Sequence, residues 1–313
     1  MTKTPILQNT AFACLAAVFC TLLWGTAFPF IKLGYSVLEI SQEDIGSKLL
    51  FAGLRFLFAG IMVYLFLCVS QKRFPTLHKN DFGKVFAYGF VQTAMQYIFT
   101  YVGIGFTSST NTSIITSCGS FITVLIAPLF FKSDRLTVLK ILGCAVGFSG
   151  VLVMNGFSAS SVDTLFGDAL ILLSTLCTAS GNVISKKLAQ KINPVELTAF
   201  QLMLGGAVLT LIGVILGGRM NIANTQGLLI LLWLVFVSAA AFSVWTALLK
   251  YHPASKISVF NLLVPIFGTV LSGVMLGESV FRAETLISLV LISLGIAAVN
   301  ISLGSKRKNR RKI

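Results

Sequence analysis

The sequence predicts an all-α membrane protein whose ten transmembrane helices form two inverted five-helix repeats. Three observations predict this fold class: the composition, the number of apolar spans, and the similarity between the two halves of the chain. Of the 313 residues, 56% are hydrophobic and only 11% are charged, and the mean hydropathy is +0.90. A soluble domain carries about 25% charged residues and needs them to cover its surface. The composition therefore excludes a soluble enzyme, a disordered chain and a disulfide scaffold.

The first half contains five apolar spans, and a helix needs about 20 apolar residues to cross a bilayer. Residues 4–31 give the first span, which we expect to be retained as a helix and not cleaved as a signal peptide. Residues 49–71 give the second, interrupted only by Arg55. Residues 85–131 carry no charge and are long enough for two helices, with a turn rich in Gly, Ser and Thr between them. Residues 141–162 give the fifth.

The second half has five further spans. Before them, the segment from Asn155 to Leu165 is rich in Ser, Ala, Gly and Asp, which is typical of a loop and predicts the connection between the halves. The first of these spans carries Asp168 at its start. The five runs are residues 167–185, 197–218, 220–249, 257–277 and 285–305.

Lysine and arginine are distributed unevenly between the connections, and short cytoplasmic loops are the ones enriched in these residues. With the N-terminus in the cytoplasm, most of the 24 basic residues fall on the cytoplasmic side. We therefore expect a multi-pass protein of the cell membrane with both termini cytoplasmic. The net charge of +14 then reflects topology anchors near anionic lipid and does not indicate nucleic acid. The basic residues left outside are Lys32, Lys48, Arg219 and Arg282.

The two halves resemble each other in sequence. Residues 51–60 align with residues 197–206, and residues 133–137 align with residues 277–281. Because five is an odd number, the second copy enters the membrane upside down relative to the first. Such repeats have a pseudo-two-fold axis in the membrane plane and can rock about a central site. We expect the first repeat at residues 1–157, the second at 158–303, and a basic cytoplasmic tail at 304–313.

Three short motifs mark the first, second and ninth spans: Leu23-Trp24-Gly25-Thr26-Ala27-Phe28, Leu54-Arg55-Phe56 and Leu276-Gly277-Glu278. Together they resemble the motifs of the drug/metabolite transporter superfamily, and more narrowly of its ten-helix EamA-type family of metabolite exporters. The first half departs from the family at Lys132-Ser133-Asp134, where Gly-Glu is usual. The resemblance implies a secondary transporter that exports small metabolites such as amino acids across the cell membrane by alternating access.

Arg55 lies inside the second span, and Asp168 lies at the start of the sixth. An ionisable group in hydrocarbon costs about 2.5–3.5 kcal/mol on insertion scales, so Arg55 requires a compensating interaction. Either Arg55 faces a polar cavity and pairs with a carboxylate or phosphate of the solute, or it caps a helix end or pairs with an acid such as Glu278. Asp168 either lies at a helix N-terminus, where the dipole favours an anion, or is a proton site that couples transport.

Amide side chains are the main candidates for solute binding. Gln92 and Gln96 are four residues apart and so share one helix face. They can bind the carboxylate and amine of a zwitterion, or they can join neighbouring helices by hydrogen bonds worth about 0.6–2 kcal/mol. In the ninth span, Pro265 frees a backbone carbonyl. We predict that Gln92 and Gln96 bind the solute, with Tyr97, Trp24, Asn111, Asn182, Trp245 and Asn261 as weaker candidates.

Several features absent from the sequence narrow the function. It has no Gly-x-x-x-x-Gly-Lys-Ser/Thr phosphate loop, which excludes ATP hydrolysis. Its six cysteines form no Cys-x-x-Cys pair and it has two histidines, so we expect no metal and no cofactor. The expected partners are a small-molecule solute and membrane lipid, in a monomer or weak homo-oligomer. A membrane-embedded enzyme and a passive channel are the alternative functions, although no nucleophile with its base is evident.

Overall fold

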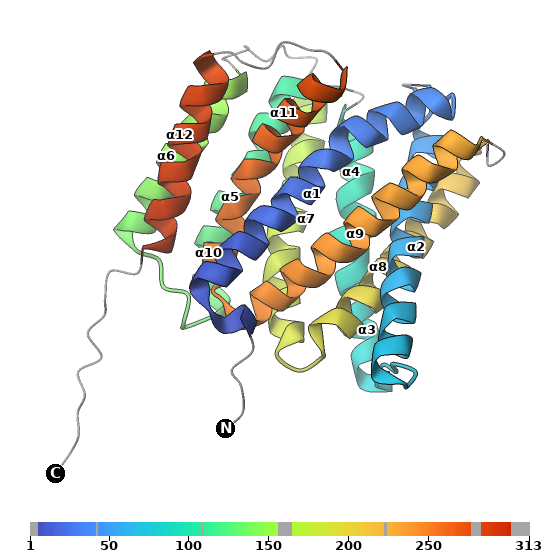
Figure 1. Cartoon of the computed structure of the whole chain (residues 1–313), viewed down its shortest axis with the longest axis horizontal. Coiled ribbons are helices and arrows are strands. Elements are labelled where there is room, and N and C mark those ends of the chain that lie inside the picture. The colour runs from blue at the N-terminus through green and yellow to red at the C-terminus, as the bar shows by residue number, and fades with distance from the viewer. Residues whose placement is uncertain are drawn as a thin grey trace.

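The protein is a bundle of long helices (Figure 1). The computed structural model describes residues 6–41, 43–104, 106–107, 109–155, 165–221, 224–276 and 283–301, and these residues form no strand. The elements in chain order are η1 (Ile6–Gln8), α1 (Thr10–Val37), α2 (Ile45–Gln71), α3 (Lys79–Gly89), η2 (Phe90–Met95), α4 (Gln96–Ile104), α5 (Ser109–Phe130), α6 (Val138–Asn155), α7 (Leu165–Ala189), α8 (Pro194–Ile215), α9 (Thr225–Tyr251), α10 (Ala254–Ser258), η4 (Val259–Leu262), α11 (Leu263–Leu276) and α12 (Ala283–Asn300).

Seven of the described helical segments are long and apolar enough to cross a membrane: α1, α2, α7, α8, α9, the continuous run α10–η4–α11, and α12. Shorter apolar helices lie at Ile115–Phe130 and Val138–Val153, within α5 and α6. The elements α3, η2 and α4 follow one another without a break from residue 79 to residue 104. The spans predicted from the sequence fall on these segments, with ends displaced by several residues.

Side-chain caps fix where several helices begin. Asn9 accepts hydrogen bonds from the first turn of α1, and Asn193 does so for α8, which begins with Pro194. Asp44 Oδ1 accepts from the Ser47 backbone N–H at 2.8 Å at the start of α2. Hydrogen bonding from Ser47 lowers the pKa of Asp44 below its usual value, because the bonds stabilise the carboxylate form.

The helices pack in pairs that join the two halves of the chain. α2 packs against α8 and α6 against α12, while α1 packs against α9 and α11, and α7 against α4 and α5. Glycine allows the closest approaches: a Cβ on Gly53 would clash with Thr210, and a Cβ on Gly206 would clash with Leu57. At the Gly143-x-x-x-Gly147 motif, both glycines of α6 face Gly295 of α12.

Two helical runs depart from α-geometry. The third span is a π-helix over η2, and such turns are frequent at functional sites. In the ninth span a 3-10 segment, η4, comes just before Pro265, whose missing N–H cannot bond the carbonyl of Asn261. In the turn before it, the carbonyl of Ser258 accepts a hydrogen bond from Ser120 Oγ at 2.8 Å. A side chain of α5 therefore satisfies a carbonyl next to the break.

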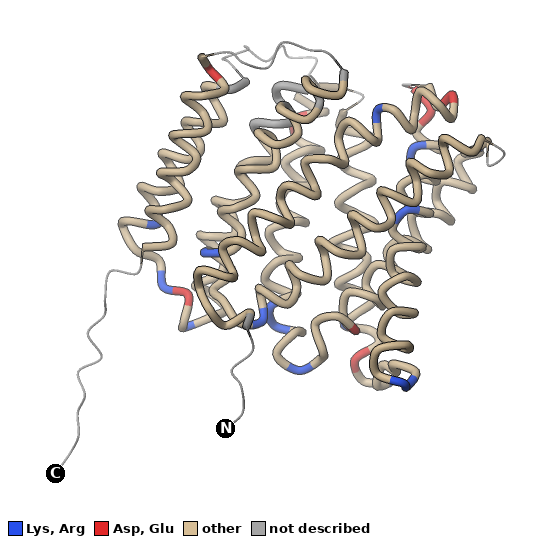
Figure 2. The backbone as a smooth tube through the Cα atoms, viewed as in Figure 1, with Lys and Arg blue, Asp and Glu red and all other residues tan. Residues whose placement is uncertain are grey.

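Charged residues gather at the two ends of the bundle (Figure 2). The lower end, as drawn in Figures 1 and 2, is where α1 begins and α12 ends. Its connections and the adjoining helix ends carry most of the described lysines and arginines. Lys32 near the end of α1, Lys48 in the first turn of α2 and Arg219 between α8 and α9 belong to the opposite, upper end by their places in the chain. Large apolar side chains cover the outside of the helices between the ends, for example Leu15, Leu129 and Val274. This surface fits a hydrocarbon environment.

Candidate functional site

A row of aromatic rings runs through the middle of the bundle. Tyr97 lies 4.5 Å from Phe56, and Phe56 lies 6.1 Å from Phe242, measured between ring centroids. Phe242 is 5.4 Å from Trp24, which in turn is 5.0 Å from Trp245. These separations are those of favourable aromatic pairs. The rings come from α1, α2, α4 and α9, so both halves of the chain contribute to the row. Trp24 and Trp245 thus lie inside the bundle, not in an interface belt.

Asn182 fixes the Trp245 end of this row. Trp245 Nε1 donates to Asn182 Oδ1 at 3.1 Å, and Asn182 Nδ2 donates to Thr123 Oγ1 at 3.5 Å. All three side chains are buried. A buried indole N–H requires an acceptor, so Asn182 sets the orientation of the indole and links α7 to α5 and α9.

The two predicted glutamines do lie side by side. Gln92 Nε2 donates to Gln96 Oε1 at 3.3 Å, and Gln92 is 6% exposed. The other end of the Gln92 amide, Oε1, is buried and has no hydrogen-bond partner among the described residues. This oxygen lies directly over Gly181 of α7, in space that any Cβ at that position would take. The π-turn and Gly181 together hold an acceptor that no described residue satisfies.

Arg55 is buried, and the structure identifies its contacts. It is 3% exposed, its Nε donates to Ser238 Oγ at 2.7 Å, and its guanidinium lies 5.0 Å from the centre of the Phe56 ring. Within the described ranges, Arg55 pairs with no carboxylate. Glu278, one of the partners considered from the sequence, lies outside the described residues.

The remaining predicted residues have different surroundings. Asp168 lies in the first turn of α7, where the helix dipole favours an anion. Its carboxylate accepts a hydrogen bond from Thr107 Oγ1. Asn261 lies on η4, and its buried Oδ1 has no partner in the described part of the chain. The side chain of Asn111 lies outside what the structure describes.

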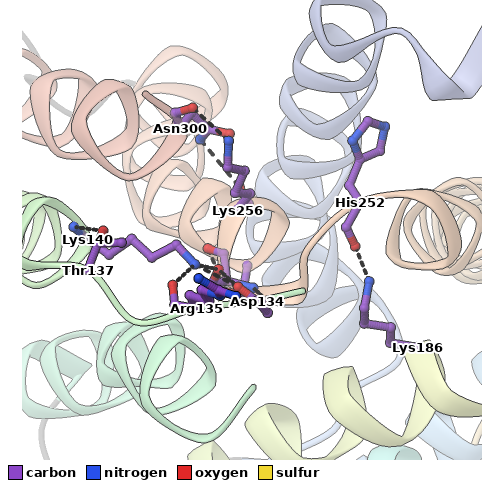
Figure 3. A network of polar contacts seen from close by, with 10 residues as sticks. Asp134, Arg135, Thr137, Lys140, Lys186, His252, Lys256 and Asn300 are labelled. Atoms are coloured by element: carbon purple, nitrogen blue, oxygen red, sulfur yellow. Dashed lines mark hydrogen bonds and ion pairs between the residues drawn. The ribbon is translucent and has the colours of Figure 1, made fainter. Parts of the chain in front are cut away.

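The sequence analysis missed a buried polar cluster at the lower end (Figure 3). Asp134 is completely buried and pairs with Lys140 Nζ at 2.7 Å. It also accepts from the backbone N–H of Ser255 at 3.0 Å and from Ser255 Oγ, while Lys140 donates to the carbonyl of Arg135 at 2.7 Å. The ion pair belongs to the first half of the chain and Ser255 to the second, so the cluster joins the halves.

Two more lysines of this end cap helix C-termini. Lys186 donates to the carbonyls of Leu249, at 3.1 Å, and His252, where α9 ends. Lys256 donates to the carbonyl of Asn300, at 2.9 Å, where α12 ends. Cations are stabilising at helix C-termini, and their N–H groups satisfy carbonyls that have no partner within the helix. These lysines therefore also stabilise the lower end, besides any part that they play in topology.

The sequence of this chain is similar to those of known transporters. The sequence model of the EamA-like transporter family matches residues 11–156 and 165–301. An uncharacterized transporter of Archaeoglobus fulgidus is 29% identical, with 88% of this chain and 94% of that protein covered. A probable amino-acid metabolite efflux pump of Salmonella typhimurium is 26% identical, with 90% and 92% covered.

This chain superposes on the crystal structure of another protein with a TM-score of 0.75, and the superposition covers 91% of this chain and 96% of the other chain. The two sequences are 17% identical, so this likeness shows the fold alone.

Proposed function

This chain belongs to the EamA-like transporter family, and on that premise we propose that it is a secondary transporter that exports small metabolites such as amino acids by alternating access. Family and relatives are membrane transporters, so the protein is a multi-pass membrane transporter and not an enzyme. The amino-acid class of solute rests on the name of one relative, the Salmonella typhimurium protein.

The architecture that we propose is ten spans in two inverted repeats, at residues 1–157 and 158–303, with a tail at 304–313. The repeated match of the family model, at 11–156 and 165–301, supports it. So does the packing pattern. In the proposed repeats α1 corresponds to α7, α2 to α8, the run α3–α4 to α9, α5 to α10–α11, and α6 to α12. Under this correspondence the packed pairs α2–α8 and α6–α12 map onto themselves. The contacts of α1 with α9 and α11 map onto those of α7 with α4 and α5.

The observation that carries the proposal is the set of buried polar atoms that have no hydrogen-bond partner among the described residues. Unsatisfied polar atoms in a membrane-spanning bundle are costly, and functional sites are where such a cost is retained. Gln92 and Asn261 each keep such an oxygen, and Gln92 is hydrogen-bonded to Gln96. We assign solute contact to Gln92 and Gln96 first, and then to Tyr97, Trp24, Asn111, Asn182, Trp245 and Asn261.

Alternating access requires the halves to separate at one end at a time. The lower end is held by contacts between them, such as those of Asp134 with Ser255. Because Lys140 stays with Asp134 on the first half, parting from Ser255 would leave no unpaired charge. We place this lower end, with both termini, in the cytoplasm, in keeping with its basic connections.

We further propose that transport is weakly coupled or uncoupled to protons. A proton carrier commonly has an acid in the pathway whose pKa burial raises toward neutral pH. In the described part of the chain, Asp134 is already paired with Lys140, and Asp168 is hydrogen-bonded at a helix start. If a proton is carried, Asp168 is the first residue to substitute.

The test is solute flux in proteoliposomes that contain the purified full-length chain. Vesicles loaded with a mixture of the twenty amino acids should release some of them at a rate that saturates with concentration. Protein-free vesicles and vesicles with an unrelated membrane protein are the controls. Flux that rises linearly without saturation would favour a passive channel instead.

A further inference from the structure

The guanidinium of Arg55 has donors that the described residues leave unused. Nε is bound to Ser238, and among the described residues neither Nη nitrogen has a hydrogen-bond acceptor. The side chain is almost completely buried. Desolvating a charged group without pairing it is costly, so an acceptor that reaches the two Nη groups would be bound strongly. Two parallel N–H donors match the two oxygens of a carboxylate.

The side chains around Arg55 are also suited to an anion. Tyr97 lies 4.5 Å from Phe56, the ring under the guanidinium, and Tyr101 lies 6.0 Å from Tyr97, measured between ring centroids. The buried hydroxyl of Tyr35 has no hydrogen-bond partner among the described residues. The ammonium of Lys48, two turns before Arg55 on α2, lies 5.8 Å from the centre of the Tyr35 ring. Phenol O–H groups donate to carboxylates, and the guanidinium of Arg55 attracts an anion.

Apolar surface begins directly beside the guanidinium. Phe56 lies under Arg55, and the aromatic row continues from it in both directions, toward Tyr97 and toward Phe242. The site therefore offers a charged fork at one point and aromatic faces next to it. A compound with a carboxylate and an apolar portion matches both features at once.

We propose that Arg55 recognises the carboxylate of the transported solute, so that the substrates are small organic carboxylates with an apolar part, amino acids among them. This inference rests on the proposed transport function and deepens it. The Ser238 hydrogen bond orients the guanidinium plane and leaves the Nη pair to face the solute. Gln92 and Gln96 then bind other polar groups of the same molecule.

The experiment compares three compounds that differ at one group: L-leucine, L-leucinamide, which lacks the carboxylate, and 4-methylpentanoate, which lacks the amine. Binding to the purified full-length protein is followed by tryptophan fluorescence, because Trp24 and Trp245 belong to the aromatic row. Both carboxylates should bind at least about 10-fold more tightly than the amide, as expected for a hydrogen-bonded charge. Arg55→Gln should abolish that preference.

Matched variants keep the result interpretable. Gln96→Ala should weaken leucine and leucinamide alike and leave their ratio unchanged. Tyr101→Phe removes one hydroxyl with little risk to folding and should reduce the preference about fivefold, which serves if Arg55→Gln does not fold. Equal binding of acid and amide, binding of neither, or a preference that survives Arg55→Gln would overturn the proposal. Saturable export of solutes without a carboxylate would overturn the substrate class alone, whereas no saturable export of any solute would overturn the transport function as well.

Discussion

Arg55 on α2 and Gln201 on α8 occupy aligned positions in the two halves of the chain and make matching hydrogen bonds. Arg55 Nε donates to Ser238 Oγ on α9, and Gln201 Nε2 donates to Thr93 Oγ1 on η2. Each donor lies on the second helical run of its half, and each acceptor on the third run of the other half. The contacts thus obey the same relation as the helix packing, but only the first half places a charge there.

Gln96→Ala is expected to lower solute affinity about 5- to 150-fold, because losing a hydrogen bond to a desolvated partner costs about 1–3 kcal/mol. The fold should survive, since the substitution buries no new polar group. Substrate-dependent flux in proteoliposomes gives the affinity. Gln226→Ala, at an exposed position near the start of α9, is the matched control and should behave as wild type. Unchanged kinetics for both variants would assign Gln96 to helix packing.

Gly181→Ala is expected to disturb the Gln92 amide, because the new methyl group would occupy the position of its Oε1. Solute affinity should fall as much as in Gln92→Ala. The double variant Gly181→Ala/Gln92→Ala should be no worse than Gln92→Ala alone, since the two changes act through one contact. Gly83→Ala is the control, because nothing lies within 4 Å of a Cβ there. Additive losses in the double variant would separate Gly181 from Gln92.

Lys140→Met is expected to destabilise the protein by about 3–5 kcal/mol, because it leaves the buried carboxylate of Asp134 without its partner. Asp134→Asn combined with Lys140→Met should cost less than Lys140→Met alone, since no buried charge then stays uncompensated. Denaturant unfolding of the purified protein in detergent measures the loss. The exposed pair of Lys84 and Asp81 gives the comparison, and Lys84→Met should cost much less than Lys140→Met, because water screens an exposed ion pair. Equal losses at the two lysines would show that the Asp134 cluster does not stabilise the lower end.

Single cysteines test the orientation of the bundle. In a cysteine-free background, Ser41→Cys at the upper end should react with a membrane-impermeant maleimide in intact cells. Thr76→Cys, between α2 and α3 at the lower end, should react only after the cells are opened. Both positions are exposed, so accessibility differs only by the side of the membrane. The reverse pattern would place the termini outside.

The sequence predicted much of the fold because hydropathy reports the average environment of each segment. Charge-free runs located the helical segments, and the spacing of Gln92 and Gln96 correctly predicted that they are neighbours. Hydropathy cannot report a π-turn such as η2, because a π-turn depends on which backbone groups are hydrogen-bonded to each other and not on composition. The pairing of Trp245 with Asn182 was equally out of reach, since it joins helices far apart in the chain.

The Asp134 cluster shows a second limit. A single acid among basic residues in a short connection resembles an exposed loop, and its burial arises only when Ser255 and Lys140 close over it. The available signal was that Asp134 stands alone between Lys132 and Arg135 in a loop otherwise free of acids. The sequence indicated that Arg55 requires a compensating interaction, but its contact with Ser238 depends on the packing of α2 against α9, which the sequence does not report.

Counterflow in proteoliposomes tests most directly whether the chain is a carrier that alternates between two openings. Vesicles preloaded with unlabelled leucine are placed in a trace of labelled leucine, and uptake is compared with that of empty vesicles. Alternating access predicts transient accumulation of label only in the preloaded vesicles, and a smaller accumulation with Gln96→Ala. Label that merely equilibrates, at the same rate whether or not the vesicles are preloaded, would contradict the account.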